Sequence, residues 1–316
     1  MMKDSHKLPR TLQEAIQYFS DQQTCLDLVA QLRWPDGPVC PRCASKEYRF
    51  IKTRSLWECK GCKKQYSVKV GTIFEDSPIK LDKWLCALWM LVNCKNGISS
   101  YEVGRALGVT QKTAWFMMHR LRLALHCGSF DKKLNGPVEA DETYIGGLAR
   151  NMHWKKREAL KSTGEKGKGR FGKAVVMGML ERNGEVRAKV LEGAFKKDLH
   201  DAIRQHVKQG AELITDEHMS YQGLYKEYAH RVINHAQTYV EGSIHTNGIE
   251  NFWSLLKRGI KGTYVSVEPF HLFRYLDEQT FRFNARKQTD QDRFIQALST
   301  IHGRRLTYQH LTSLPS

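Results

Sequence analysis

Four cysteines have the spacing of a metal site. Two residues separate the members of each pair and fifteen residues separate the pairs, which are Cys40 with Cys43 and Cys59 with Cys62. Structural zinc takes four thiolates in a tetrahedron, and each Cys-x2-Cys turn can place two sulfurs on one side of the ion. Disulfides and a thioredoxin-like redox pair are the alternatives. Disulfides are disfavoured if the protein stays in the reducing cytosol, as we expect below. A redox pair is disfavoured because there are two Cys-x2-Cys pairs, so the spacing predicts a structural zinc site.

Three carboxylates and one lysine have the residue types that phosphoryl transfer needs. Asp141 lies on an apolar strand-like stretch, Asp216 ends another, and Glu250 lies near the start of a helical stretch. Strand ends and a helix start can meet at one edge of a sheet, where carboxylate oxygens suit Mg²⁺ or Mn²⁺. Two such ions can hold the attacking and leaving oxygens of an in-line displacement. Lys257 follows Glu250 by seven residues on the same helix face, where it could hold a phosphate.

Each of these residues also has a purely structural explanation. Asp141 and Asp216 could be turn or cap residues at strand ends, and Glu250 could belong to a helix cap that begins at Asn247. Lys257 could be a surface lysine. Taken singly, each acid is better explained in this way, so the catalytic interpretation depends on their combination with a DNA-binding region in the same chain.

The elements that must position the carboxylates alternate between strand and helix patterns. Strand-like stretches cover 138–145, 174–180, 186–191 and 212–215, and helical patterns cover 197–208 and 245–260. This order predicts an α/β layered domain of about 150 residues. A basic, glycine-containing stretch at 150–173 is expected to be a loop that either contacts DNA or is simply solvated.

The module that contains the cysteine pairs is strongly basic. Between positions 40 and 69 there are nine Lys or Arg residues, two acids and four interleaved aromatic residues. Basic side chains on so small a module can neutralise several backbone phosphates, although a merely soluble surface is the alternative. The residues from which we expect DNA contacts are Arg49, Lys52, Arg54, Lys63 and Lys64.

A second DNA-binding pattern follows at 98–115. Ser99 or Ser100 can cap a short helix, Gly108 permits a tight turn, and Thr110 can cap a second helix. The second helix of a helix-turn-helix presents its N-terminal residues to the bases. Those residues are Gln111, Lys112 and Thr113. A helical hairpin that only packs against its neighbours has the same pattern, so both interpretations stay open.

The net charge agrees with an anionic partner. The chain has 316 residues, with 50 Lys and Arg against 33 Asp and Glu, and a formal net charge of +17. Such an excess favours nucleic acid or, less often, an acidic membrane surface. The longest uncharged apolar stretch, 84–94, is too short for the roughly 20 residues of a membrane span, and the N-terminus lacks the apolar region of a secretion signal. We therefore expect a cytoplasmic, nucleoid-associated protein without a membrane partner.

With these patterns together, the chain resembles bacterial insertion-sequence transposases that join an N-terminal zinc ribbon to a DDE-type catalytic domain. The resemblance covers nearly the whole chain, and its most particular stretches are CPRC with CKGC, ADETYIGG, ITDEHMSY, HTNGIENFWSLLKRGIKGTY and FRFNAR. It implies a ribonuclease-H-like fold, with Asp141 and Asp216 as the first two metal ligands and Glu250 as the third. Some relatives carry Asn or His in the third place, followed by a lysine. Here the acid is present, Asn247 one turn earlier could share its role, and His245 has no assigned role.

The activity that the resemblance implies is DNA transposition. The ribbon and the helix-turn-helix would bind the terminal repeats of a mobile element. Asp141, Asp216 and Glu250 would hold two Mg²⁺ or Mn²⁺ ions for 3′-end cleavage and strand transfer into target DNA. Chemistry at two element ends favours a homodimer or a higher oligomer on DNA. The alternatives are a catalytically silent DNA-binding regulator derived from a transposase, a metal-dependent nuclease without strand transfer and, more distantly, an RNA-binding zinc-ribbon protein.

The expected fold class is α/β, with a ribonuclease-H-like catalytic domain preceded by a zinc ribbon and a helix-turn-helix. The expected boundaries are an N-terminal helical segment at 1–35, the zinc ribbon at 36–78, the helix-turn-helix region at 79–130, the catalytic domain at 131–290 and a C-terminal tail at 291–316.

Overall fold

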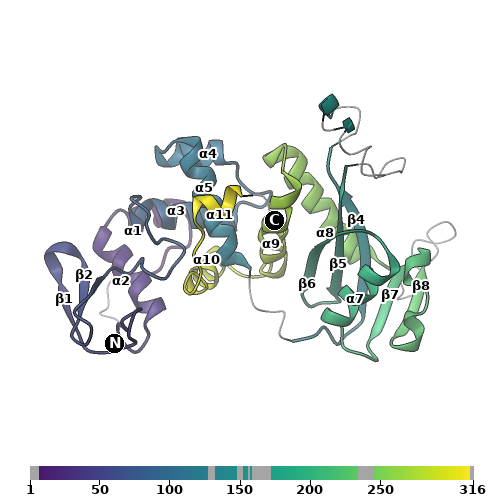
Figure 1. The fold of residues 1–316 in the computed structure, drawn as a ribbon, viewed down its shortest axis with the longest axis horizontal. Helices are drawn as coiled ribbons and strands as arrows, with labels where there is room; N and C mark the ends of the chain where they lie inside the picture. Colours follow the sequence, from purple (N-terminus) through teal and green to yellow (C-terminus); the bar gives the residue numbers. More distant parts are fainter. Residues whose placement is uncertain are drawn as a thin grey trace. The chain divides into compact units, whose positions relative to one another are not determined.

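The computed structural model describes residues 7–126, 132–147, 152–155, 157–158, 172–233 and 245–313. The chain forms two compact units (Figure 1), one made of Met1–Cys127 with Ala285–Ser316 and the other of Gly128–Asn284. Most of the basic stretch at 150–173 lies outside the described residues. Of the helices that are described, none is long and apolar enough to cross a membrane.

The first unit begins with two helices, α1 (Leu12–Phe19) and α2 (Gln22–Arg33). They are separate helices because the Asp21 side chain caps the second one by accepting a hydrogen bond from a backbone amide. Directly after α2, the indole of Trp34 packs edge-on against Trp57 and Tyr66, with ring centroids 5.2 and 5.9 Å apart. The helical segment therefore packs onto the ribbon that follows it.

The ribbon is a three-stranded antiparallel sheet in the order β1–β2–β3. Its strands are β1 (Tyr48–Ile51), β2 (Leu56–Cys59) and β3 (Gln65–Tyr66). A 3₁₀ turn, Lys52–Arg54, joins the first two strands. The first cysteine pair precedes β1 and the second begins at the end of β2, so the sheet carries the two pairs toward each other.

Three helices follow, α3 (Leu81–Asn93), α4 (Ser100–Leu107) and α5 (Gln111–Leu125). A capping box between Ser99 and Glu102 starts α4, and Gly108 ends it in the left-handed conformation. Thr110 caps α5. The two helices and their short turn lie where the sequence predicts them, while their assignment as a DNA-binding helix-turn-helix stays a prediction.

The C-terminal segment completes the core of the first unit. It contains α10 (Asp290–Ser299) and the short α11 (Tyr308–Thr312). Phe294 is fully buried, and its ring centroid lies 5.3 Å from those of Phe19 and Trp89. The sequence predicts a catalytic domain at 131–290 and a tail at 291–316. In the structure the second unit ends at Asn284, because α10 packs against α2 and α3 and Phe294 contacts Phe19 of α1.

The second unit is built on a five-stranded mixed sheet in the order β6–β5–β4–β7–β8. Its strands are β4 (Val138–Ile145), β5 (Ala174–Glu181), β6 (Val186–Leu191), β7 (Glu212–Asp216) and β8 (Ala229–Ile233). The first three form an antiparallel meander, and β7 and β8 add in parallel on the other side of β4. This is the ribonuclease-H-like arrangement that the resemblance implies. The edge strand β8 was missed because only Ile233 within it is buried.

Helices cover both faces of this sheet. On one face, α7 (Lys196–His206) packs against β5 and β6, and its Leu199 belongs to the same buried cluster as Val138 and Ala140 of β4. On the other face lie α8 (Asn247–Arg258), a π-helical turn (Gly259–Tyr264) and α9 (Leu272–Asn284). Because strand side chains alternate between faces, odd-numbered residues of β4 face α8 and even-numbered residues face α7.

Candidate active site and zinc cluster

The four cysteines lie together, as their spacing predicts. Their sulfurs all lie within 4.8 Å of one another, with Cys40 to Cys62 at 3.7 Å and Cys43 to Cys59 at 3.5 Å. A tetrahedron with Zn–S bonds of about 2.3 Å has sulfurs about 3.8 Å apart. The donor set and its dimensions therefore fit structural Zn²⁺.

Asp141 and Asp216 lie side by side on neighbouring strands. The parallel ladder between β4 and β7 pairs Glu139 with Ile214, so two residues further along the same register Asp141 comes beside Asp216. Both side chains belong to the sheet face that α8 covers, because Ala140 and Leu213 belong to the core on the α7 side. Strand pairing and alternation thus bring two of the three predicted carboxylates together.

The carboxylate of Asp141 is held by a tryptophan from α8. Nε1 of Trp253 donates a 2.9 Å hydrogen bond to Oδ2 of Asp141. The Trp253 ring lies directly over Gly178, the β5 residue paired with Asp141, where a Cβ atom would come within 2.5 Å of the ring. Burial raises the pKa of Asp141 to about 7, the nearby carboxylates of Glu142 and Asp216 raise it too, and the Trp253 hydrogen bond opposes the rise. A cation beside Asp141 would relieve this unfavourable burial of negative charge.

The start of α8 is fastened to β4 by a buried glutamate. Oε2 of Glu139 accepts a 2.9 Å hydrogen bond from the backbone amide of Ile249 in the first turn of α8, and its side chain is 1% exposed. Oε1 of Glu139 pairs with Nε of Arg182 at 3.0 Å and lies 3.4 Å from Nδ1 of His245. A carboxylate at a helix N-terminus is favourable because it accepts a hydrogen bond from a free backbone amide and places negative charge at the positive end of the helix dipole. This contact places His245 in the attachment of α8 to the sheet.

Glu250 lies one helical turn before Trp253 on α8, with an exposed side chain. Its Oε1 accepts a 3.0 Å hydrogen bond from Oγ1 of Thr246. The N-cap position is Thr246, and Asn247 is the first helical residue. Among the described residues, only the cysteine cluster brings three or more possible metal ligands within 4.8 Å of one another. The three predicted carboxylates therefore do not all lie within that distance of one another.

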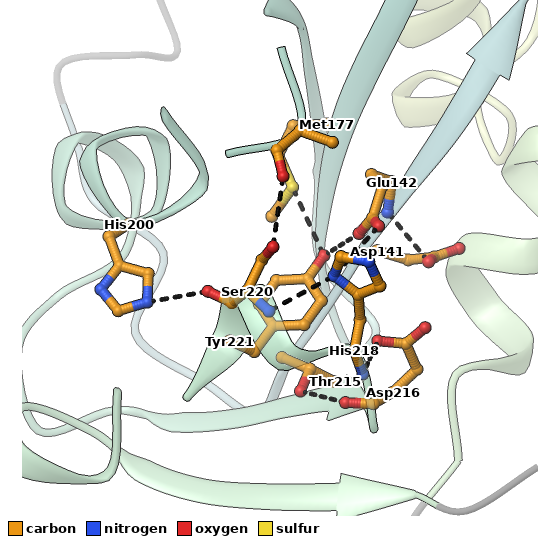
Figure 2. A network of polar contacts seen from close by, with 10 residues as sticks. Asp141, Glu142, Met177, His200, Thr215, Asp216, His218, Ser220 and Tyr221 are labelled. Carbon is orange, nitrogen blue, oxygen red and sulfur yellow. Dashed lines mark hydrogen bonds and ion pairs between the residues drawn. The ribbon is translucent and has the colours of Figure 1, made fainter. Parts of the chain in front are cut away.

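A polar network that the sequence pattern did not predict lies next to the two aspartates (Figure 2). The hydroxyl of Tyr221 donates a 2.5 Å hydrogen bond to Oε2 of Glu142, and Nδ1 of His218 lies 3.8 Å from Oε1 of the same residue. Oδ1 of Asp216 accepts a 3.0 Å hydrogen bond from the His218 amide. Burial and the Glu142 charge raise the pKa of Tyr221 well above its usual value, so it stays a donor. The signal was present in the sequence, since Glu142 and His218 stand one and two residues from the predicted ligands.

Lys257 lines a pocket of about 520 Å³ beyond the end of β4. Lys173 and Lys261 line the same pocket, and its lining contains no carboxylate among the described residues. The wall also includes Gly147, at which a Cβ atom would meet nothing within 4 Å. Three lysines without a carboxylate in the described lining, one of them on the helix that carries Glu250, make this pocket suitable for a phosphate group.

The predicted DNA-binding residues of the ribbon are exposed. Lys52 and Arg54 stand on the turn between β1 and β2, and Lys63 and Lys64 follow the second cysteine pair. Arg49 forms a 2.8 Å ion pair with Glu58 across β1 and β2. These positions leave the cations accessible to a DNA backbone.

The three predicted base-contacting residues at the start of α5 each have an interaction inside the protein. Nε2 of Gln111 donates to Oγ of Ser100 at 3.0 Å, and the hydroxyls of Thr113 and Thr110 lie 2.9 Å apart. Nζ of Lys112 lies 5.0 Å from the ring centroid of Tyr308. The Lys112 side chain remains exposed.

Comparison with known proteins agrees with the description of both the cysteine ribbon and the sheet of the second unit. Residues 133–284 match the ISXO2-like transposase domain, and residues 20–65 match the transposase zinc-ribbon domain. Both matched family models describe transposase domains. An uncharacterized protein in transposable element ISH50 of Halobacterium salinarum is 25% identical over 252 residues, which cover 77% of this chain and 84% of that protein. No solved structure is significantly similar to the chain.

Proposed function

We propose that this transposase cleaves the 3′ ends of its insertion sequence and transfers them into target DNA. The observation that carries the proposal is the placement of Asp141 beside Asp216, under the helix that carries Glu250. Asp141 and Asp216 lie on the neighbouring strands β4 and β7, and Glu250 lies on α8, which Glu139 attaches to β4. Phosphoryl transfer needs positioning and charge neutralisation more than a general base, and this arrangement meets that need.

Asp141, Asp216 and Glu250 are the residues that would hold two Mg²⁺ or Mn²⁺ ions. Their oxygen donors suit hard cations. Burial and the neighbouring carboxylates raise the pKa of Asp141, which supports a cation there because a bound cation would offset that effect. Such ions supply activation of a water or 3′-hydroxyl nucleophile and neutralise charge on the phosphate. Glu250 would have to approach the two aspartates when a cation is bound, and an exposed side chain on a helix can do so by changing its rotamer.

The protein's own cations, in both units, would bind the DNA backbone. Lys257 would hold a backbone phosphate in the basic pocket of the second unit. The exposed Lys and Arg residues of the ribbon would bind the element end, and α4 with α5 would act as the helix-turn-helix. Two ends must be processed in one event, so we propose a homodimer or a higher oligomer on DNA.

A strand-transfer assay tests the proposal. The full-length protein would be incubated with Mg²⁺, a target plasmid and labelled duplexes from the DNA that flanks its own gene. Asp216→Asn removes one negative charge at constant size, and Asp201→Asn is the matched control, because Asp201 is a 56% exposed surface acid on α7. We expect joined products from the wild type and the control and none from Asp216→Asn.

The other outcomes separate the alternatives. Cleavage without joining in Mg²⁺ or Mn²⁺ would support a metal-dependent nuclease instead. End-specific binding with no cleavage would support a catalytically silent regulator. Equal joining by Asp216→Asn and the wild type would exclude Asp216 from the site.

A further inference from the structure

A separate pocket of about 410 Å³ lies in the first unit along one face of α5. That face presents residues at successive turns of the helix, Lys112 and Thr113, then Phe116, then Arg120. The opposite walls come from the 76–79 segment, from Trp84 on α3 and from Tyr308 on α11. All of these walls belong to one compact unit, so the pocket is a feature of that unit alone.

Cations and aromatic rings alternate along this pocket. Nζ of Lys112 lies 5.0 Å from the Tyr308 ring centroid, and the Tyr308 ring packs edge-on against Phe116 at 5.6 Å. The guanidinium of Arg120 lies 5.4 Å from the Phe116 ring and 5.3 Å from the Trp84 ring. Tyr308 is 42% exposed and Lys112 is also exposed, so the outer end of this series opens to solvent.

The inner end of the series is a buried cation that lacks a carboxylate partner. Arg120 is 3% exposed, and its Nη2 donates to the backbone carbonyl of Glu75. Its Nε has no hydrogen-bond partner, and none of the described carboxylates forms an ion pair with it. Asp76 lines the same pocket but is 68% exposed and pairs with Arg305. Burial lowers the pKa of Arg120 to about 10, and the more distant charges of Asp76 and Glu75 offset only part of this effect.

Buried donors and charges are almost always paired, so the unpartnered Nε of Arg120, next to a pocket that opens to solvent, favours an anionic ligand there. Aromatic rings beside that cation add a surface on which a planar base can stack, and this combination is how proteins bind single-stranded nucleic acid. Bases in a duplex are already stacked and cannot enter such a pocket. We propose that this pocket binds an unpaired nucleotide of the DNA substrate, with its base against Tyr308, one backbone phosphate at Arg120 and the neighbouring phosphate at Lys112.

The inference rests on the proposed function only in taking DNA as the substrate, and it is independent of the carboxylate site. It changes the role of Lys112, which the sequence pattern assigned, together with Gln111 and Thr113, to base contacts at the start of the second helix. Lys112 would contact a single strand instead. Opening or nicking of the element end would supply such a strand.

Equilibrium binding of the full-length protein to fluorescent DNA tests the pocket. The probes are a labelled single-stranded oligodeoxythymidylate and a labelled duplex of the same length. Tyr308→Ala removes the exposed ring, Tyr308→Phe keeps it, and Tyr225→Ala is the control, because Tyr225 is a 69% exposed tyrosine in the other unit. Stacking of one base predicts a loss of about 5- to 150-fold in single-strand affinity for Tyr308→Ala. Tyr308→Phe and Tyr225→Ala should bind as the wild type does, and duplex affinity should stay within twofold for all three.

Lys112→Gln provides a second measurement that does not depend on the aromatic ring. It should reduce the salt dependence of single-strand binding by about 0.7 in the slope of log affinity against log salt, the value for one phosphate. Lys208→Gln, at an exposed position after α7, should leave the slope unchanged.

An equal loss of duplex and single-strand affinity in Tyr308→Ala would overturn the proposal, as would no loss of either. In both cases the series of rings and cations only attaches α11 to α5. Because Asp216→Asn leaves this pocket intact, failed strand transfer with a preserved Tyr308 effect would reject the proposed catalysis and keep the nucleotide site.

Discussion

The contact between α8 and the sheet depends on a glycine, and Gly178→Ala tests it. A Cβ atom at this position would lie 2.5 Å from Cζ2 and 2.6 Å from Cη2 of Trp253, and 2.8 Å from Cδ1 of Ile249. Carbon atoms in contact prefer about 3.5–4.0 Å, so the indole would have to withdraw by about 1 Å. The ring cannot swing freely, because Trp253 is 4% exposed and packs against Phe252.

Overpacking of this kind costs about 1–3 kcal/mol. A 1 Å displacement of the indole also threatens the 2.9 Å bond from Nε1 to Asp141, and a hydrogen bond to a charged group contributes about 1.5–3 kcal/mol. With a urea m-value of about 1–3 kcal/mol/M, we expect the unfolding midpoint of the second unit to fall by about 1 M or more. Strand transfer should fall with it, because Asp141 loses the donor that orients it.

Urea unfolding followed by circular dichroism measures the effect, and two further variants make it specific. Gly262→Ala is the control, because a Cβ atom there meets nothing within 4 Å, and its midpoint should stay near that of the wild type. Trp253→Phe lacks the clashing ring atoms, so Gly178→Ala should cost less in that background than in the wild type. A Gly178→Ala protein as stable as the wild type would show that the indole does not lie over β5, and the account of how α8 is held would fail.

Zinc removal by a chelator should unfold the ribbon and leave the thermal transition of the second unit in place, which near-ultraviolet circular dichroism checks. Cys59→Ser should lose zinc, whereas Cys25→Ser, at a buried thiol that is not a ligand, should keep it. The zinc content of each purified variant checks this difference. The pKa of Asp141 is raised to about 7, so below that pH a bound cation must displace a proton from its carboxyl group. The Mn²⁺ affinity, measured by calorimetry, should therefore rise about tenfold from pH 6 to pH 8. An affinity that does not change with pH would contradict the assignment of Asp141 as a metal ligand. Burial lowers the pKa of His206 to about 4, so the unfolded chain gains a proton below about pH 6.5 that the folded chain does not. The urea midpoint should therefore drop between pH 6.5 and pH 4, less steeply in His206→Leu than in the wild type.

Local patterns account for most of the elements. The strand at 138–145 was predicted with its observed bounds, and helix caps such as Ser99 and Thr110 act where the sequence places them. These features are local because a cap or an alternating strand involves residues within a few positions of one another. The cysteine cluster also follows from spacing, since a Cys-x2-Cys turn needs only its own residues to present two sulfurs.

The tertiary structure decided what those elements do for one another. The pairing of β4 with β7 set Asp141 beside Asp216, because strand register is chosen by partners far away in the sequence. The buried Glu139 that fastens α8, the indole over Gly178 and the network around Glu142 all depend on contacts across the sheet.

The sequence by itself therefore determined which chemical groups this protein carries. They are four thiolates, acids at strand ends and on one helix, and a large excess of cationic side chains. Only the tertiary structure decided that α10 closes the core of the first unit. It also decided that Arg120 is buried beside a pocket and forms no ion pair with any of the described carboxylates. The reason is that burial and pairing depend on packing between segments distant in the chain, which residue type and spacing do not specify.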